Sequence, residues 1–361
     1  MELIPKNYKI YNKLNYMRKL KNKRRQKQIK RKINMLIYFC AEYFVKQILI
    51  LIKIIIIFIF LFILFINITK RIPETNNGQT QLITKSKIKI ALCAISKNEN
   101  RYIKYFLENY KNLGYNHIYL YDNNDIGDEP IIALQIVKDL IKEDFLTVIE
   151  YRNKTGLFQT DSYHDCYRKY NSKYDWISFF DLDEYLILAN NQSIQDFFDN
   201  QRFNNCESVQ FNWKVFNDNE QLDFEDKSPI ERFPVETSYT YEQQHIKSTI
   251  RGGLDYNRMI EIGSPHTVYR NVKACTSSGK PNNNRFFSLP VDYENGALNH
   301  YVTKTIKEYF LKRIKTKAEA DNLENISQSN KNYWFDYFFK INKKTKEKVD
   351  IFNKLFHTNF Q

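Results

Sequence analysis

Hydrophobic positions from residue 87 to residue 180 follow two alternating periods. Short apolar or every-second-residue patterns predict four strands, at 87–95, 117–121, 145–151 and 176–180. Apolar residues spaced three and four positions apart predict three helices between them, at 100–113, 131–142 and 159–173. Strands and helices in alternation are typical of a mostly parallel sheet flanked by helices. We therefore expect an α/β domain.

The pattern changes after residue 185. Short aromatic-rich strands and polar loops are expected over about 209–290, as an elaboration of the first half. The last part of the chain is rich in Lys, and helices are expected there at about 304–317 and 333–356. We place the α/β domain at 87–315 and a C-terminal helical extension at 316–361.

The most hydrophobic segment is 47–68, in which Lys53 is the only charged residue. As a helix rising about 1.5 Å per residue, it is long enough to cross a hydrocarbon core of roughly 30 Å, so we expect a transmembrane anchor. Residues 1–32 hold thirteen Lys or Arg against the single acid Glu2. The positive-inside rule therefore predicts a basic cytosolic tail and a type II orientation. Residues 69–86 are polar and are expected to form a stem.

Charge and glycine content exclude several classes of site. The formal net charge is +14, but the basic tail carries +12 of it, which leaves +2 for the rest of the chain. A nucleic-acid enzyme usually spreads basic residues over its folded domain, so we expect no nucleic-acid partner. Neither G-x-G-x-x-G nor G-x-x-x-x-G-K-[ST] occurs, which argues against a Rossmann dinucleotide site and a P-loop.

Cysteine usage fits a lumenal domain. Four cysteines lie beyond the predicted membrane segment, namely Cys93, Cys166, Cys206 and Cys275. They allow three disulfide pairings, and the sequence does not choose among them.

The most informative stretch is WISFFDLDEY, residues 176–185. It places Asp181 and Asp183 at the carboxyl end of an apolar strand, where ligands of open α/β sheets bind. A divalent cation would neutralise these carboxylates and keep positions open for phosphate oxygens. The alternative is a solvated acidic turn that caps the next helix. We favour the metal and expect the turn to face solvent.

Three stretches, in this order, resemble the signatures of glycosyltransferase family 92 and of family 2-like proteins. They are SKNENRYIKYFLENYKNLGYNHIYLYDN, DWISFFDLDEYL and LNHYVTKTIKEYFLKR, and the resemblance covers about 88–315. It implies a GT-A fold, a nucleotide-sugar donor, a divalent metal that is usually manganese, and an inverting transfer. FNDN at 216–219 departs from the family, in which a glycine commonly follows the aromatic residue.

The resemblance also assigns roles to the acidic stretch. Asp181 and Asp183 match the motif that binds the metal and the diphosphate. His300, in LNHY, matches the late histidine of the family and is expected to complete the metal site. His266, in SPHTVY, is the alternative metal ligand.

The nucleotide is expected to bind near the first two strands. The pocket of the family begins after the first strand, where this chain has Ser96, Lys97 and Glu99. Asp122 ends the second strand and suits uracil or ribose binding, or else it forms an Asx turn. Lys247 and Arg251 lie four residues apart and are expected near the diphosphate, with a solvated face as the alternative.

An inverting transfer needs a base that takes the proton of the acceptor hydroxyl. The unranked candidates in the second half of the chain are Asp218, Glu220, Asp255 and Glu261. Asp218 follows Trp213 and Phe216, which could form an aromatic platform for a sugar.

Together these patterns predict a type II membrane glycosyltransferase of the hexosyltransferase type. Its catalytic domain would lie in the lumen of the Golgi or of another secretory-pathway membrane. It would transfer a sugar from a nucleotide-sugar, such as a UDP-sugar, to a glycan or glycoconjugate hydroxyl. The alternatives are a metal-dependent phosphohydrolase and a catalytically inactive, membrane-tethered carbohydrate-binding protein.

Overall fold

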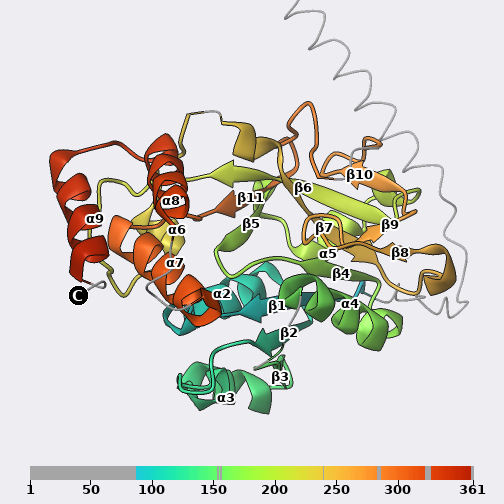
Figure 1. The fold of residues 1–361 in the computed structure, drawn as a ribbon. Helices are drawn as coiled ribbons and strands as arrows, with labels where there is room; N and C mark the ends of the chain where they lie inside the picture. Colours follow the sequence, from blue (N-terminus) through green and yellow to red (C-terminus); the bar gives the residue numbers. More distant parts are fainter. Residues whose placement is uncertain are drawn as a thin grey trace, which may run out of the picture. The chain divides into compact units, whose positions relative to one another are not determined.

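The structure is a computed structural model that describes residues 87–358, except 153, 155–156, 239, 283–285 and 322–326 (Figure 1). The predicted cytosolic tail, transmembrane anchor and stem lie outside the described residues. Within the described ranges, no helix combines the length and the hydrophobicity needed to cross a membrane. Residues 85–361 form one compact unit.

The first half of this unit forms a parallel sheet, as its hydrophobic pattern predicts. Its strands are β1 (Ile90–Ser96), β2 (His117–Asp122), β3 (Leu146–Glu150) and β4 (Trp176–Phe179). They lie in the order β3-β2-β1-β4, and each neighbouring pair is parallel. This part of the fold prediction is confirmed, with strand limits that differ from the predicted ones by three residues at most.

Helices cover both faces of these strands. The helices are α2 (Asn100–Leu113), α3 (Gln135–Lys142) and α4 (Phe158–Tyr170). Side chains of α2 and α3 pack in one core with Leu92 and Ala94, whereas side chains of α4 pack in another with Ala91 and Cys93. Alternate residues of β1 therefore point into two different cores, as expected of a strand buried on both faces.

The sheet is mixed beyond β4, so the prediction of a mostly parallel sheet holds only for the first half. The additional strands are β5 (Glu184–Leu188), β6 (Ser208–Val215), β7 (Ile246–Arg251), β10 (Ala274–Thr276) and β11 (Gly296–His300). β7 is antiparallel to β4 and to β6, and β11 is antiparallel to β5 and parallel to β6. β10 is also parallel to β6.

Helix length explains the change of strand direction. A parallel neighbour requires a crossover, which is usually a full helix. In the described part of the chain, the α-helix between β6 and β7 is the short α6 (Pro229–Arg232), and α5 (Ile194–Phe198) lies before β6. β6 and β7 therefore pair as antiparallel neighbours. Two further short strands, β8 (Ile260–Glu261) and β9 (Tyr269–Arg270), form a separate antiparallel pair.

The C-terminal part is helical, with α7 (Ile306–Asp321), α8 (Gln328–Ile341) and α9 (Lys346–Thr358). Figure 1 shows these three helices gathered at one end of the sheet. An aromatic cluster that includes Phe310, Phe338 and Phe356 joins them. The helix expected at 333–356 is interrupted at Asn342, whose backbone is extended. The expected boundary at residue 315 lies inside α7.

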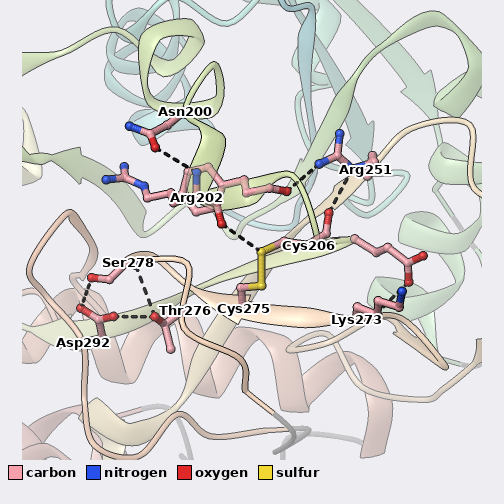
Figure 2. The surroundings of a disulfide bond; sticks show 11 residues. Asn200, Arg202, Cys206, Arg251, Lys273, Cys275, Thr276, Ser278 and Asp292 are labelled. Atoms are coloured by element: carbon pink, nitrogen blue, oxygen red, sulfur yellow. Dashed lines mark hydrogen bonds between the residues drawn. A yellow bond between two sulfur atoms is a disulfide. The ribbon is translucent and has the colours of Figure 1, made fainter.

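Two disulfides resolve the pairing that the sequence left open. Cys93 in β1 is bonded to Cys166 in α4, and Cys206 is bonded to Cys275 in β10. Figure 2 shows the second disulfide between the segment that leads into β6 and the neighbouring strand β10. Each disulfide therefore ties a strand of the sheet to an adjacent segment.

Candidate active site

The acidic turn, residues 181–184, joins β4 directly to β5. The next element is thus a strand, so the turn does not cap a helix. Asp183 is 7% exposed and Glu184 is fully buried, which contradicts the expectation of a solvent-facing turn. The buried Leu182 side chain anchors the turn in the core. Carboxylates buried in this way need partners.

Asp181 is held by three donors from two elements. Its Oδ1 accepts hydrogen bonds from the Tyr163 hydroxyl at 2.8 Å, from the Lys247 ammonium at 2.8 Å and from the Gln159 amide. Gln159 and Tyr163 belong to α4, and Lys247 belongs to β7. Burial disfavours the Lys247 charge, but Asp181, together with Glu184 and Asp183, outweighs this effect and raises the pKa of Lys247. Asp181 therefore faces a fixed positive charge.

Asp183 is surrounded by cationic and imidazole groups. Its Oδ1 lies 3.5 Å from Nε2 of His300, and its Oδ2 lies 3.8 Å from the ammonium nitrogens of Lys304 and Lys312. Burial alone would raise the pKa of Asp183. The two lysines and His300 outweigh burial and hold the pKa of Asp183 well below its usual range. Asp183 is therefore ionised at neutral pH.

Glu184 behaves differently from its neighbours. Its Oε2 accepts a hydrogen bond from the Asp181 backbone amide at 2.9 Å, and the Lys247 ammonium lies 3.9 Å away. Burial raises the pKa of Glu184 well above its usual range, and Lys247 offsets this only in part. Glu184 therefore braces the turn from within the core, through its bond to the Asp181 backbone amide.

A polar pocket of about 320 Å³ opens beside Asp183, between the loop after β1 and the start of α7. Its lining includes Glu99, Lys304 and Lys312. Oε1 of Glu99 accepts a hydrogen bond from Lys312 at 2.7 Å and lies 3.6 Å from Lys304. The two ammonium groups thus lie between Glu99 and Asp183, in the wall of the pocket. Burial lowers the pKa of Lys304, and Asp183 compensates only in part.

The docking of α7 positions these lysines. Glu308, in the first turn of α7, accepts hydrogen bonds from Tyr102 of α2 and from Arg232 of α6, the latter at 2.8 and 3.1 Å. Sequence reasoning assigned no role to Lys304 or Lys312. The sequence could have indicated both lysines. Lys304 is the last residue of the NHY-x-x-K motif, and Lys312 follows about two helical turns later.

The predicted nucleotide residues are dispersed. Glu99 lines the polar pocket, and Lys97 forms an ion pair with Asp125 at 3.1 Å. Ser96 is fully buried at the end of β1. Oδ1 of Asp122 accepts a hydrogen bond from the Asn124 amide at 3.0 Å, which is an Asx turn.

The second oxygen of Asp122 is also occupied. It accepts a hydrogen bond from the Ile131 amide at 2.9 Å and one from Arg152 at 3.4 Å. Asp122 is 1% exposed. The structure therefore shows the alternative that the sequence left open, an Asx turn, and Asp122 has no oxygen free for uracil or ribose.

Arg251 lies at the opposite end of β7 from Lys247. It pairs with Trp176 at the start of β4, and its guanidinium lies 4.3 Å from the indole centroid. The guanidinium donates to the carbonyl of Cys206 at 3.0 Å (Figure 2) and to that of Phe203 at 2.8 Å. Four residues of a strand span roughly 13 Å. The two cations therefore do not cluster, and only Lys247 reaches the acidic turn.

The four base candidates have partners elsewhere. Glu220 is exposed and accepts a hydrogen bond from Lys343 at 2.6 Å. Asp218 is buried, and its Oδ2 lies 2.5 Å from the Lys348 ammonium of α9. Asp255 caps a short 3₁₀ turn, and Glu261 accepts a hydrogen bond from Arg168 at 2.9 Å. Among the residues that the structure describes, none of these four carboxylates bonds to a residue of the acidic turn.

Trp213 is the centre of a histidine cluster and not an open platform. The cluster consists of His245, His266 and His300, with ring centroids 5.0, 5.2 and 4.1 Å from that of Trp213. His245 stacks on the indole, and Trp213 is 9% exposed. The indole is therefore not available for stacking on a sugar. The Phe216 ring packs instead on the Tyr301 ring, with 5.1 Å between the two ring centroids.

The site offers two side chains that fit a divalent cation. Oδ1 of Asp183 and Nε2 of His300 are 3.5 Å apart, a separation that two ligands at about 2.1 Å from one cation can have. Asp181 fits less well, because its Oδ1 already accepts three hydrogen bonds. Among the residues that the structure describes, no group of three or more His, Cys, Asp or Glu is arranged to hold a metal. A cation here would need further ligands from the substrate.

Comparison with known proteins identifies the family. The sequence model of glycosyltransferase family 92 matches residues 89–347. No curated protein sequence matches the chain significantly. Among solved structures, S. aureus TarS 1–349 has a TM-score of 0.34 and 13% identity, over 70% of this chain and 71% of that chain.

Two further structures show similarly low scores. TarS 1–349 in complex with UDP has a TM-score of 0.34 and 12% identity, over 70% of this chain and 71% of that chain. The apo structure of WbbM, a bifunctional glycosyltransferase, has a TM-score of 0.24 and 11% identity, over 38% of this chain and 24% of that chain.

Proposed function

Because the chain belongs to glycosyltransferase family 92, we propose that it transfers a hexose from a UDP-sugar, with inversion, to a hydroxyl of a glycan or glycoconjugate. The supporting observation is that Lys304 and Lys312 both lie 3.8 Å from Asp183 in the wall of a polar pocket. Two ammonium groups at the carboxyl end of a sheet suit a diphosphate.

Lys304 and Lys312 would bind the donor diphosphate in this pocket. As the bond between the sugar and the diphosphate breaks, negative charge develops on the departing phosphate oxygen. Preorganised positive groups stabilise such charge without having to reorganise during the reaction. Asp183 and Glu99 hold the two lysines in place before the donor binds.

Asp183 and His300 would hold a divalent cation, which we propose to be Mn²⁺. When bound, the cation supplies further positive charge for the departing diphosphate. Asp181 and Glu184 would maintain the shape of the turn through Lys247 and through the backbone amide of Asp181.

The compartment we propose is the lumen of the secretory pathway, with the chain as a type II membrane protein of the Golgi or a related membrane. The two disulfides support an oxidising environment. The apolar segment 47–68 and the basic residues before it support the anchor and its orientation.

The test is donor binding by the full-length chain in detergent. A panel of nucleotide-sugars is screened for turnover, and UDP affinity is measured by calorimetry. Removing one charge-assisted contact costs about 1.5–3 kcal/mol, so Lys304→Met should weaken UDP binding roughly 10- to 100-fold. Lys227→Met, at an exposed lysine paired with Glu225, is the matched control. Unchanged UDP affinity in Lys304→Met would overturn the proposed donor site.

A further inference from the structure

A second cavity lies at the start of β7, where His245 lines it two residues before Lys247. It measures about 420 Å³ and is lined by residues that include His245, His266 and Phe287. Lys247 joins this cavity to the turn, because its ammonium bonds to Asp181 and its charge lowers the pKa of His266. The polar pocket is linked to the turn through Lys304 and Lys312, which lie 3.8 Å from Asp183. The His266 cavity is linked to it through Trp213, because His266 and His300 both pack on this indole and His300 lies 3.5 Å from Asp183.

The hydrogen bonds of His266 fix its tautomer. Its Nδ1 lies 2.9 Å from the carbonyl oxygen of Ile246, and a carbonyl can only accept. Nδ1 therefore carries the hydrogen, and Nε2 carries a lone pair. Within the described ranges, Nε2 has no hydrogen-bond partner. His266 thus lines the cavity with an imidazole whose ring is oriented by a backbone contact and whose Nε2 is a proton acceptor.

We propose that His266 is the catalytic base of the transfer and that the cavity beside it holds the terminal sugar of the acceptor. This inference rests on the proposed function. Nε2 takes the proton of the acceptor hydroxyl, and the hydroxyl oxygen forms the new bond to the anomeric carbon. The bond from that carbon to the diphosphate breaks, and its electron pair leaves with the nucleoside diphosphate. The imidazolium then releases its proton to solvent.

Aromatic rings around the cavity fit a neutral sugar. Phe287 lies 4.8 Å from His245 and 5.2 Å from Tyr241, between ring centroids. Tyr241 is 51% exposed and Phe286 is 37% exposed, so two rings of this group are accessible. Exposed aromatic faces pack on the C–H faces of sugars, while histidine and serine side chains take hydroxyl hydrogen bonds.

The charges around His266 are compatible with this role. Burial and Lys247 lower the pKa of His266 to about 4, while Asp181 opposes them. His245 and Arg270 are the other titratable or charged groups that line the cavity. The imidazole is therefore neutral near pH 7 and ready to accept a proton. A pKa near 4 is that of an ordinary carboxylate, the type of base first sought among Asp218, Glu220, Asp255 and Glu261.

The experiment uses azide, an anionic nucleophile that needs no base. The full-length protein is given the nucleotide-sugar that it hydrolyses fastest, and both water hydrolysis and glycosyl azide formation are measured. His266→Gln should slow hydrolysis by about 10²- to 10⁴-fold, the usual contribution of a general base. With azide, the His266→Gln variant should form glycosyl azide at a rate within about tenfold of the wild-type turnover. Its UDP affinity should equal that of the wild type.

His164→Gln is the matched control, because His164 is also buried and bonded to a carbonyl, that of Val268 at 2.9 Å. It should behave as wild type. Folding is checked by thermal melting, with His266→Asn as a second variant. Unchanged hydrolysis, or a loss that azide does not restore, would overturn the role of His266 and leave the proposed function intact. A wild-type protein that turns over no nucleotide-sugar would overturn both.

Discussion

The polar pocket and the His266 cavity are both linked to the acidic turn through residues of their linings or their neighbours, but they differ in charge. The polar pocket presents Lys304 and Lys312 to an ionised Asp183. The His266 cavity presents neutral imidazoles and exposed aromatic rings. Fixed positive charge suits a departing diphosphate, whereas a neutral acceptor group suits a hydroxyl that must lose its proton. Under the proposed function, one short turn would serve two partners, since Asp181 and Asp183 are each held by their own set of donors.

Of the changes considered, removing the Asp183 carboxylate should have the largest effect on stability and on sugar transfer. Breaking a buried ion pair costs about 3–5 kcal/mol, because the partner charges stay buried. Asp183→Ala should therefore lower the free energy of unfolding by about 3 kcal/mol and slow sugar transfer roughly 10²- to 10³-fold. Chemical denaturation and initial rates measure the two effects. The control is Glu220→Ala, at an exposed carboxylate paired with Lys343. An equally small change in both variants would show that Asp183 is not essential to the pocket.

The pH dependence of the free energy of unfolding should report the protonation of His266. Its pKa is about 4 in the folded protein and about 6.5 when unfolded, so the unfolded chain binds the proton more readily between these values. His266 therefore contributes stability that is complete above about pH 6.5 and decreases as the pH falls toward 4. Between pH 7 and pH 5, wild type should lose about 2 kcal/mol more than His266→Gln in urea denaturation. Equal losses would mean that His266 titrates normally and that Lys247 does not act on it.

His300 should show the smallest of the three effects. It is the histidine that the structure brings to Asp183, whereas His266 bonds to the carbonyl of Ile246. His300→Ala should weaken Mn²⁺ binding about tenfold or more in the presence of UDP, by comparison with the losses seen for outer-shell ligands. Calorimetric titration of both histidine variants measures the difference. A larger shift for His266→Ala would assign the metal to His266 instead of His300.

The first half of the fold could be predicted from the sequence because its elements are regular. α2 was predicted at 100–113 and occupies Asn100–Leu113, and its end is set by Gly114, whose φ of 98° is one that glycine adopts readily. The second half could not be predicted in the same way. Its strands are short, and β6 pairs with β10 and β11, which lie more than sixty residues later in the sequence. Hydrophobic periodicity carries no information on such long-range pairing.

Only the part of the candidate site that lies in continuous sequence motifs could be predicted. The acidic turn and His300 belong to motifs that are continuous in sequence, and the structure brings them together. Whether a polar side chain is free to bind a ligand depends on partners that the sequence does not show. Asp122 and Asp218 resembled free carboxylates, but backbone amides occupy one and Lys348 the other. The role of Lys312 depends on how α7 docks against α2, which no local pattern predicts.

The two disulfides close loops of similar size on either side of the acidic turn. They join cysteines 73 and 69 residues apart, and the turn lies in the segment between the two loops. In the chain-entropy model each cross-link raises the free energy of the unfolded chain by roughly 4 kcal/mol. Tyr163 belongs to the first loop, and Lys247 and His266 belong to the second. A reducing environment would therefore remove the constraint on both flanks of the turn at once, and the partners that hold Asp181 would lose their covalent support together.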